Sequence, residues 1–400
     1  KNFCSFADKA TIAFEDIRKG IDTKNNMFCD SPAGARLSKV SIIVGPNASG
    51  KTSALKALAF LGWFVCNSFV GLDGEEVIPV DTFAFSEDKE KTSEFELIFE
   101  HKQVIYKYML ELCRTHVIRE ELYGKKKTRH FNYLFKRKWN PEKKSSDITQ
   151  KIGLKTEVIK EVLRKNVSLI ATSVAIKNEA LIDIASYWSN IITNVNRGGK
   201  SWEASSLGDI GIFRATEEYS KNSNFFKKVG AFLREIDLGL EDISIEEVEA
   251  HAEKTGEVKK IHLPFGIHKI NQKTYKLPFP LESNGTKNMY VLLHFLMPAI
   301  ERGGTAVIDE LEIDIHPHAL SRIIELFANP ITNQNNSQLL FTSHSLEILN
   351  HLEKEQINLV EKRDCKSKLY RLDELRRVVR RDDNMYAKYM AGAYGAVPNI

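Results

Sequence analysis

The segment Gly45 to Thr52 reads G-P-N-A-S-G-K-T, which has the residue types and spacing of a phosphate-binding loop. Gly45 and Gly50 allow the backbone to turn tightly and to approach a phosphate closely. The amide hydrogens of the loop and the positive end of a following helix then face the anion. Lys51 can reach the β- and γ-phosphates, and the Thr52 hydroxyl can bind magnesium. The residues expected to contact the nucleotide are Gly45, Pro46, Asn47, Ala48, Ser49, Gly50, Lys51, Thr52 and Ser53.

Two acids follow an apolar run much later in the chain. Asp309 and Glu310 come directly after Thr305–Ile308. A carboxylate at the end of a strand beside a phosphate loop is placed to hold magnesium through water, which we expect of Asp309. Glu310 is then the natural general base for the attacking water. Any buried strand can end in acids, so it is the pairing with Lys51 that favours a nucleotide site.

A histidine follows another apolar run. Leu339–Phe341 leads into Thr342-Ser343-His344-Ser345. A histidine at the end of a strand near the γ-phosphate could donate a hydrogen bond to it, but a lone histidine is more often an ordinary surface residue. From these residues alone, both interpretations of His344 stay open.

A polar tetrapeptide precedes the apolar helix predicted at Met289–Ile300. It consists of Ser283, Asn284, Gly285 and Thr286. Ser283 or Asn284 can cap the helix, and Gly285 allows close approach of the backbone. The segment is therefore either an ordinary helix cap or a second anion-binding helix end.

These side chains need strands and helices to bring them together. Val40–Val44 before the loop is apolar, and helical spacing from Ser53 to about Val65 follows it. Residues 1–44 read as β-rich. Alternating runs predict an antiparallel layer at Phe95–Phe99, Val104–Leu110, Val117–Tyr123 and Phe131–Phe135, with the first two joined as a hairpin at residues 101–103. Helical spacing is predicted over residues 150–196 and Phe225–Asp237, and β-like segments follow up to Tyr275.

A basic, aromatic stretch from Gly124 to Lys144 lies within this insertion. Its cations are Lys125, Lys126, Lys127, Arg129, Lys136, Arg137, Lys138, Lys143 and Lys144. Phe131, Tyr133, Phe135 and Trp139 are interleaved with them. Phosphate neutralisation and base stacking would suit a nucleic acid or another partner. Alternation alone predicts a solvated hairpin whose aromatic side chains face the core, and we favour that interpretation.

The composition is that of an ordinary globular chain. Of its 400 residues, 42% are hydrophobic and 28% charged, and the net charge of +4 is too small to imply nucleic-acid binding by itself. The five cysteines are far apart and form no C-x-x-C pair, so we expect reduced thiols and a cytoplasmic protein. We expect no membrane-spanning segment.

The order of these motifs resembles that of ABC-type ATPase heads, and most closely the AAA-15/AAA-21 group of stand-alone ATPases, kin of RloA, AbiLi and the ATPase half of OLD proteins. The resemblance is carried by the phosphate loop, E-S-N-G-T, V-I-D-E, H-P, F-T-S-H, the opening N-F-C-S-F and the ending Tyr389–Pro398. It implies an α/β fold, in which an antiparallel β-layer and a helical lobe are inserted between the phosphate loop and the signature motif of an ABC-type P-loop ATPase head. The expected parts are an N-terminal ATPase lobe at 1–145, a helical lobe at 146–280 and a C-terminal ATPase part at 281–400.

The resemblance also implies roles for single residues. Residues 283–286 look like the ABC signature, which contacts the γ-phosphate bound by the opposite subunit. Asp309 looks like the magnesium-site acid, Glu310 like the catalytic base and His344 like the switch histidine. The stretch Ile313–His316 occupies the place of the dimer-contacting loop.

Two departures from the family's pattern affect this reading. The signature differs from the transporter form L-S-G-G-Q, which argues against a transporter ATPase. No glutamine-loop residue is identified after the first helix, and Phe83 lies near where one is expected.

The function that the resemblance implies is an ATPase with ATP and Mg²⁺ as cofactors. It would form a homodimer or higher homo-oligomer around two nucleotides and control a separately encoded effector, a nuclease or toxin, in prokaryotic defence against phage. Two alternatives stay open. A compact DNA-binding repair clamp like RecF or the SMC heads would use the basic stretch Lys125–Lys144. A nuclease like the OLD proteins would need several convergent carboxylates, and Asp382-Asp383 is the only adjacent pair of aspartates after the histidine.

Overall fold

The structure is a computed structural model that describes residues 1–16, 26–86, 92–126, 130–196, 199–200, 209–236, 239–251, 258–312, 314–375, 379–380 and 383–398. Its strands are β1 (Phe28–Asp30), β2 (Arg36–Ser38), β3 (Val40–Val44), β4 (Ser93–His101), β5 (Val104–Leu112), β6 (Val117–Lys125), β7 (Asn132–Asn140), β8 (Ser145–Gln150), β9 (Ile191–Thr193), β10 (Val195–Asn196), β11 (Gly199–Lys200), β12 (Asp242–His251), β13 (Val258–Ile270), β14 (Lys273–Pro278), β15 (Thr305–Ile308), β16 (Gln338–Thr342), β17 (Ile357–Arg363) and β18 (Lys366–Arg371). Its α-helices are α1 (Lys51–Gly71), α2 (Thr156–Val162), α3 (Leu169–Ala175), α4 (Glu179–Ser189), α5 (Asp209–Ser220), α6 (Ser223–Glu235), α7 (Asn284–Arg302), α8 (Pro317–Ala328) and α9 (Met385–Met390).

A central six-stranded sheet in the order β18-β17-β3-β16-β15-β9 organises the chain. The pairs from β17 to β9 are parallel, and β18 closes one edge as an antiparallel strand. The strands β3, β15 and β16 are apolar along almost their whole length because both faces of the sheet are covered. Strand β16 lies between β3, which leads into the phosphate loop, and β15, which leads into Asp309.

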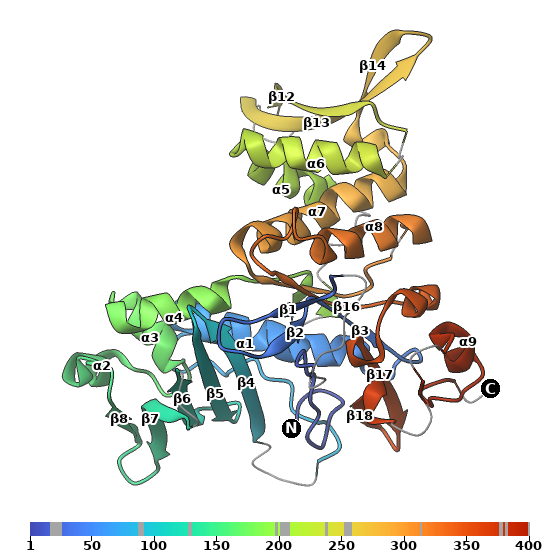
Figure 1. Ribbon diagram of the computed structural model, residues 1–400. Coiled ribbons are helices and arrows are strands. Elements are labelled where there is room, and N and C mark those ends of the chain that lie inside the picture. Colours follow the sequence, from blue (N-terminus) through green and yellow to red (C-terminus); the bar gives the residue numbers. More distant parts are fainter. Residues whose placement is uncertain are drawn as a thin grey trace.

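Helices cover the two faces of this sheet. Ile42 of β3 packs into a core formed with α7 and α8, whereas Ile43 packs with Leu55 of α1 on the opposite face. Side chains of a strand alternate between the faces, so consecutive isoleucines serve the two layers. Figure 1 shows α7 and α8 above the central sheet and α1 below it.

Helix α1 also supports the antiparallel layer β4-β5-β6-β7-β8. Its buried Phe64 and Val65 share a core with Tyr108 of β5 and Leu122 of β6. The β4–β5 hairpin turns at Lys102 and Gln103, whose φ values of 48° and 65° are those of a two-residue type I′ turn. The predicted hairpin and the predicted extension of this layer are therefore confirmed.

By length and composition alone, α1 could span a membrane, although the sequence analysis expected no such segment. No other helix in the described ranges meets that criterion. In the fold α1 packs against α3, α4 and the central sheet, which is the place of a core helix.

A second lobe rests on α7. Helices α5 and α6 pack against α7, and the three-stranded sheet β12-β13-β14 lies beyond them, at the top of Figure 1. Tyr219 of α5 is buried against Tyr290 of α7, with ring centroids 4.9 Å apart, and its hydroxyl donates to the Tyr290 carbonyl at 2.7 Å. The lobe is thus attached to the helix that begins at Ser283.

One prediction about the insertion is wrong, and one helix of the insertion was missed. The stretch 150–196 is not helical throughout, because after α4 the chain enters β9, which joins the edge of the central sheet beside β15. The helix α5 was not predicted, although its buried residues Ile212, Ala215 and Tyr219 have helical spacing. The predicted helix at Phe225–Asp237 is observed as α6. The arrangement of the sheets and helices confirms the predicted fold class, an ABC-type P-loop ATPase head with an inserted antiparallel layer and further helices.

Candidate nucleotide site

The loop between β3 and α1 has the backbone of a phosphate cradle. Gly50 precedes the helix with φ of 113°, a conformation that suits glycine, and Ala48 also has a positive φ of 60°. Gly45 is required for a different reason, since a Cβ there would lie 2.1 Å from the carbonyl oxygen of Val360 on β17. The two glycines therefore allow a tight turn at one end of the loop and close strand packing at the other.

The Lys51 side chain folds back over the loop. Its ammonium donates to the carbonyls of Gly45 at 2.9 Å and Pro46 at 3.1 Å. Burial lowers the pKa of Lys51, and neighbouring carboxylates, Asp309 foremost, offset part of that shift. The ammonium therefore sits inside the concavity where a β- or γ-phosphate would place its charge.

A chain of hydrogen bonds joins the loop to the second nucleotide segment. Thr52 Oγ1 donates to Asp309 Oδ2 at 2.8 Å, and Thr342 Oγ1 donates to Asp309 Oδ1 at 2.6 Å. The Thr342 hydroxyl also accepts from the backbone amide of Glu310 at 2.7 Å. The residues predicted for magnesium, Thr52 and Asp309, are thus in direct contact, and Thr342 of β16 holds both acids in place.

Asn194 fixes the same acid from the other side. Its side chain accepts from the Asp309 amide at 2.8 Å and donates to the Asp309 carbonyl at 3.0 Å. Asn194 is buried and follows β9 directly. The sequence analysis missed it, because a single asparagine in the insertion carries no motif and only the pairing of β9 with β15 brings it here.

Glu310 and His344 stand at the ends of neighbouring strands. Glu310 has φ of 52°, so the backbone leaves the extended conformation of β15 directly after Asp309. His344 lies on the surface, and its backbone amide donates to Glu312. The second carboxylate oxygen of Glu312 is buried without a hydrogen-bond partner in the described structure. Glu312 is therefore a further acid of this site, to which the sequence analysis gave no role.

The segment predicted as the signature is a capped helix start. Ser283 Oγ accepts from the Thr286 amide at 3.2 Å, which confirms the predicted cap, and Asn284 begins α7. A Cβ on Gly285 would lie 2.9 Å from the carbonyl oxygen of Asp314, whose carboxylate accepts from Asn288 at 3.0 Å. The helix start therefore packs against the loop that follows Glu310.

That contact places the candidate signature beside the predicted dimer loop rather than on the phosphate loop. Among the described residues, no hydrogen bond links residues 283–286 to residues 45–52 of the same chain. Ile313, the first residue of the predicted dimer loop, lies outside the described residues.

The site fits magnesium only together with a nucleotide. A hydroxyl and a carboxylate, from Thr52 and Asp309, are oxygen donors of the kind Mg²⁺ uses when phosphates and waters complete its shell. The described residues contain no group of three or more acids, histidines or cysteines that could hold a metal alone. Phe83, near the expected glutamine loop, is buried against Phe85 and supplies no ligand. Asp383 pairs with Lys388, and its neighbour Asp382 is outside the described residues.

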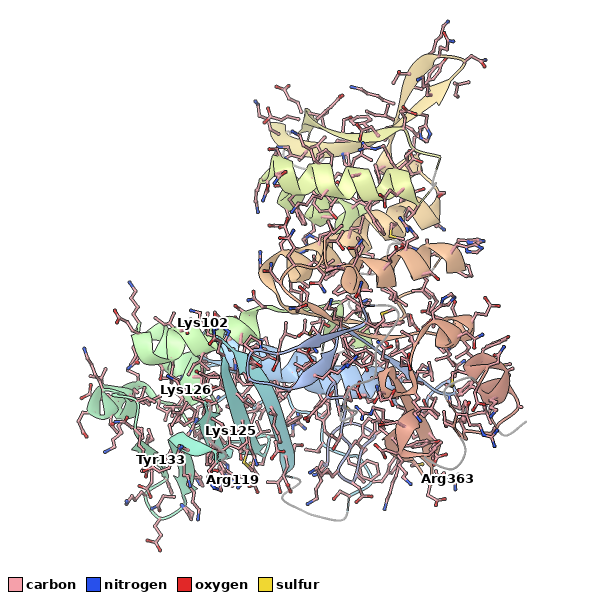
Figure 2. All side chains as sticks on the ribbon, in the orientation of Figure 1. Lys102, Arg119, Lys125, Lys126, Tyr133 and Arg363 are labelled. Atoms are coloured by element: carbon pink, nitrogen blue, oxygen red, sulfur yellow. The ribbon has the colours of Figure 1, made fainter. Side chains whose placement is uncertain are left out.

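The basic stretch forms part of the antiparallel layer, as Figure 2 shows for Lys125, Lys126 and Tyr133. Arg137 is fully buried in an ion pair with Glu120 and donates to the carbonyls of Arg164 and Lys165, so the expectation that it could contact nucleic acid is wrong. Residues 127–129 are outside the described residues.

The aromatic side chains of this stretch are divided between core and surface. Phe135 is buried in the core, as predicted. Tyr133 is partly exposed, and its ring is covered by the ammonium groups of Lys136 and Lys151 at 5.2 and 4.3 Å from the ring centroid. This ring is thus stacked with cations of the same chain.

Comparisons with known proteins identify the family of the chain. No curated protein matches the chain in sequence. Among solved structures, the chain is similar to the SMC head bound to the C-terminal winged-helix domain of ScpA, with 13% identity, a TM-score of 0.37 and coverage of 86% of this chain and 94% of that one. It is also similar to the recombination mediator protein RecF with ATP, with 11% identity, a TM-score of 0.27 and coverage of 84% and 94%. A family model matches residues 40–350, from the strand before the phosphate loop to beyond His344. The predicted membership of the AAA-21 group is thereby confirmed, and the chain belongs to the family described as "AAA domain, putative AbiEii toxin, Type IV TA system".

Proposed function

We propose that the protein binds and hydrolyses ATP in a cytoplasmic homodimer that opens and closes around two nucleotides. The observation that carries the proposal is the hydrogen-bonded chain Thr52–Asp309–Thr342–Glu310, which brings a phosphate loop and a paired acid into one site. The two segments are 257 residues apart in sequence. A protein that binds no nucleotide would not need a phosphate loop, a buried lysine and a pair of acids in one place.

Each residue then has a defined task. Lys51 moves from the loop carbonyls onto the β- and γ-phosphates, with the loop amides of residues 47–50 around them. Thr52 and Asp309 would hold magnesium, which neutralises charge on the phosphates. Glu310 takes the proton of the attacking water, and His344 donates a hydrogen bond to the γ-phosphate.

The second half of each pocket comes from the partner. Ser283 and Asn284 are exposed at the start of α7, and no described hydrogen bond joins them to their own phosphate loop. Two free backbone amides at a helix start, with the positive helix end, are suited to a γ-phosphate. In a symmetric dimer the Ser283 helix start of one subunit would cover the Lys51 loop of the other.

Two variants test this proposal. Glu310→Gln removes the base but keeps the shape of the side chain, so it should trap a closed, ATP-loaded dimer, seen as a doubling of mass by light scattering with ATP and magnesium. Lys51→Ala should remain monomeric under the same conditions and release no phosphate. The matched control is Lys366→Ala, at an exposed position of β18, which should behave as the wild type. Normal hydrolysis by Glu310→Gln would show that the assignment of the base is wrong.

We further propose that this switch controls a separately encoded effector in defence against phage. The family description includes the words "putative AbiEii toxin, Type IV TA system", and the contact between Thr52 and Asp309 supports a site for ATP. The second lobe, β12–β14 with α5 and α6, is attached to the signature helix α7 and would report its position. Affinity purification from the native host should recover a nuclease or a toxin encoded next to this gene, and recovery of the chain alone would contradict this part.

A DNA clamp of the RecF or SMC type is the second candidate. Lys125, Lys126, Lys136 and Lys138 remain outside the core of the antiparallel layer. If the layer is a clamp surface, the wild-type chain should bind DNA with an affinity that falls steeply as the salt concentration rises. Replacing these four lysines with neutral residues should then abolish DNA binding. If DNA binding is absent in the wild-type chain at low salt, this candidate is eliminated.

A further inference from the structure

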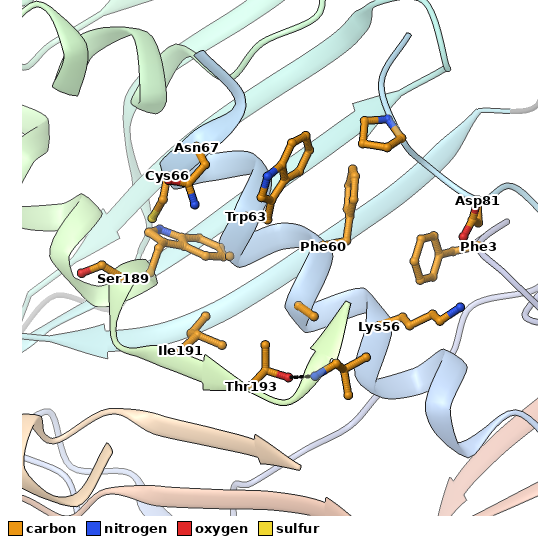
Figure 3. Close-up of a pocket in the computed structure, with 15 residues that line it drawn as sticks. Phe3, Lys56, Phe60, Trp63, Cys66, Asn67, Asp81, Ser189, Ile191 and Thr193 are labelled. Atoms are coloured by element: carbon orange, nitrogen blue, oxygen red, sulfur yellow. Dashed lines mark hydrogen bonds between the residues drawn. The ribbon is translucent and has the colours of Figure 1, made fainter. Parts of the chain in front are cut away.

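A cavity of about 570 Å³ lies along α1, beginning one turn beyond Lys51. Its floor is one stripe of the helix, formed by Lys56, Ala59, Phe60, Trp63 and Cys66 at helical spacing. Figure 3 shows one wall from Ser189 to Thr193 and the opposite end marked by Phe3 and Asp81. Small-molecule sites usually have volumes of about 300–1,000 Å³. The cavity therefore has room for a ligand, and no residue of the nucleotide site lines it.

The lining is dominated by aromatic rings. Phe3, Phe60, Trp63 and Trp188 contribute to it. Phe60 lies 6.0 Å from Phe3 and 6.3 Å from Trp63 between ring centroids, so the rings form a row along the helix. Charged groups occupy one end only, where Lys56 and Asp81 stand near Phe3 (Figure 3). A planar aromatic molecule with one polar end matches this distribution.

A glycine keeps the cavity open. Gly62 is in the middle of α1, where glycine costs about 1 kcal/mol relative to alanine. A Cβ at this position would meet nothing closer than 3.8 Å, from Ile191 and Trp188, so packing does not demand glycine. Any larger side chain would instead enter the cavity.

The cavity lies between two elements that each lead to the nucleotide site. Its floor, α1, starts with Lys51 and Thr52. Its wall includes Thr193, and the next residue, Asn194, holds Asp309 by two hydrogen bonds. A molecule that pushed the wall away from the floor would therefore move Asp309 relative to Thr52.

We propose that this cavity is an effector site for a small planar aromatic molecule with a polar end. Occupancy of the site changes the rate of the nucleotide site through α1 and Asn194. The binding step stands on the cavity alone, while the coupling step rests on the proposed ATPase function.

The test of binding uses 8-anilinonaphthalene-1-sulfonate and its neutral analogue N-phenyl-1-naphthylamine, titrated into the nucleotide-free protein and followed by fluorescence. Saturable binding of one molecule per chain is expected, and excess ADP should not displace the bound probe. Gly62→Leu should weaken the binding of both probes at least 10-fold. Gly62→Ala should keep or raise the melting temperature and weaken binding less, and Val70→Leu on the exposed side of α1 should bind as wild type. Lys56→Met should weaken the sulfonate more than the neutral probe.

Equal affinity of Gly62→Leu and the wild type would overturn the proposal, as would displacement of the probe by ADP. For the coupling, a saturating probe should change phosphate release at least 2-fold in the wild type and leave Gly62→Leu unaffected. An unchanged rate in the wild type would overturn the coupling. If the chain releases no phosphate at all, the ATPase proposal fails, and the binding result still decides whether the site exists.

Discussion

The Thr52 hydroxyl donates a hydrogen bond of 2.8 Å to Asp309 Oδ2, although 257 residues separate them in sequence. Strand β16, which ends at Thr342, lies between β3, which leads into the phosphate loop before Thr52, and β15, which leads into Asp309. Asp309 is 3% exposed, and both of its carboxylate oxygens accept hydrogen bonds from threonines. The second half of the nucleotide site is thus fixed in position before a nucleotide binds.

Thr342→Val removes a hydroxyl that serves both acids. The Glu310 amide and Asp309 Oδ1 would each lose a buried partner, so the unfolding free energy should fall by about 2 kcal/mol or more. Phosphate release should fall at least about 10-fold because Glu310 is no longer positioned. Urea denaturation and a phosphate assay measure the two effects. Thr342→Ser keeps the hydroxyl and should behave nearly as wild type, and equal behaviour of Val and Ser would contradict this role.

Arg137→Met should destabilise the antiparallel layer strongly. Arg137 and Glu120 are both 0% exposed, and breaking a buried ion pair on one side costs about 3–5 kcal/mol. Glu120 also accepts from Tyr108 and Ser168, so the loss spreads through a network. Urea denaturation of Arg137→Met and of the exposed neighbour Lys138→Ala gives the comparison. A change below about 0.5 kcal/mol for Arg137→Met would show that the ion pair is not needed.

The unfolding free energy should fall as the pH drops through the range in which His294 of the unfolded chain takes up a proton. Burial lowers the pKa of His294 below its ordinary value of 6.5, although Glu218 raises it in part and Arg214 lowers it further. Its Nδ1 is buried without a hydrogen-bond partner in the described structure. The unfolded chain then binds the proton more tightly, so the unfolding free energy declines below about pH 6.5 and goes on declining to the folded-state pKa. Chemical denaturation between pH 7.5 and 5 should show a shallower decline for His294→Gln, and parallel curves would refute the assignment.

The sequence indicated the nucleotide residues because each stands in a short motif at the end of an apolar strand. The loop, Asp309, Glu310 and His344 could be found this way, as could the alternating strands of the antiparallel layer. The predicted roles of the phosphate loop, Asp309, Glu310, His344 and residues 283–286 stay predictions, as do the domain boundaries at 145 and 280.

What the sequence could not show depends on pairing over long distances. Strand β9 has three residues, and only its register with Thr305 reveals that Asn194 supports Asp309. The sequence does not distinguish Arg137 from the other basic residues of its stretch. Its burial with Glu120 follows from the register of β6 and β7, which local spacing does not show. Local spacing carries no signal of either relationship.

The central claim is that the Ser283 helix start of one subunit completes the phosphate site of another. Two inactive variants test it when mixed. Lys51→Ala removes the ammonium group that would bind the phosphates. Asn284→Glu places a negative charge against the γ-phosphate. A glutamate in the first turn also keeps α7 stable and leaves the Ser283 cap intact.

Phosphate release by an equimolar mixture of these two variants is the decisive measurement. Each mixed dimer should contain one intact pocket, so the mixture should release phosphate well above the rate of either variant alone, and up to about half the wild-type rate if the pockets act independently. A mixture as inactive as Lys51→Ala and Asn284→Glu alone, although size measurements show mixed dimers, would contradict the account.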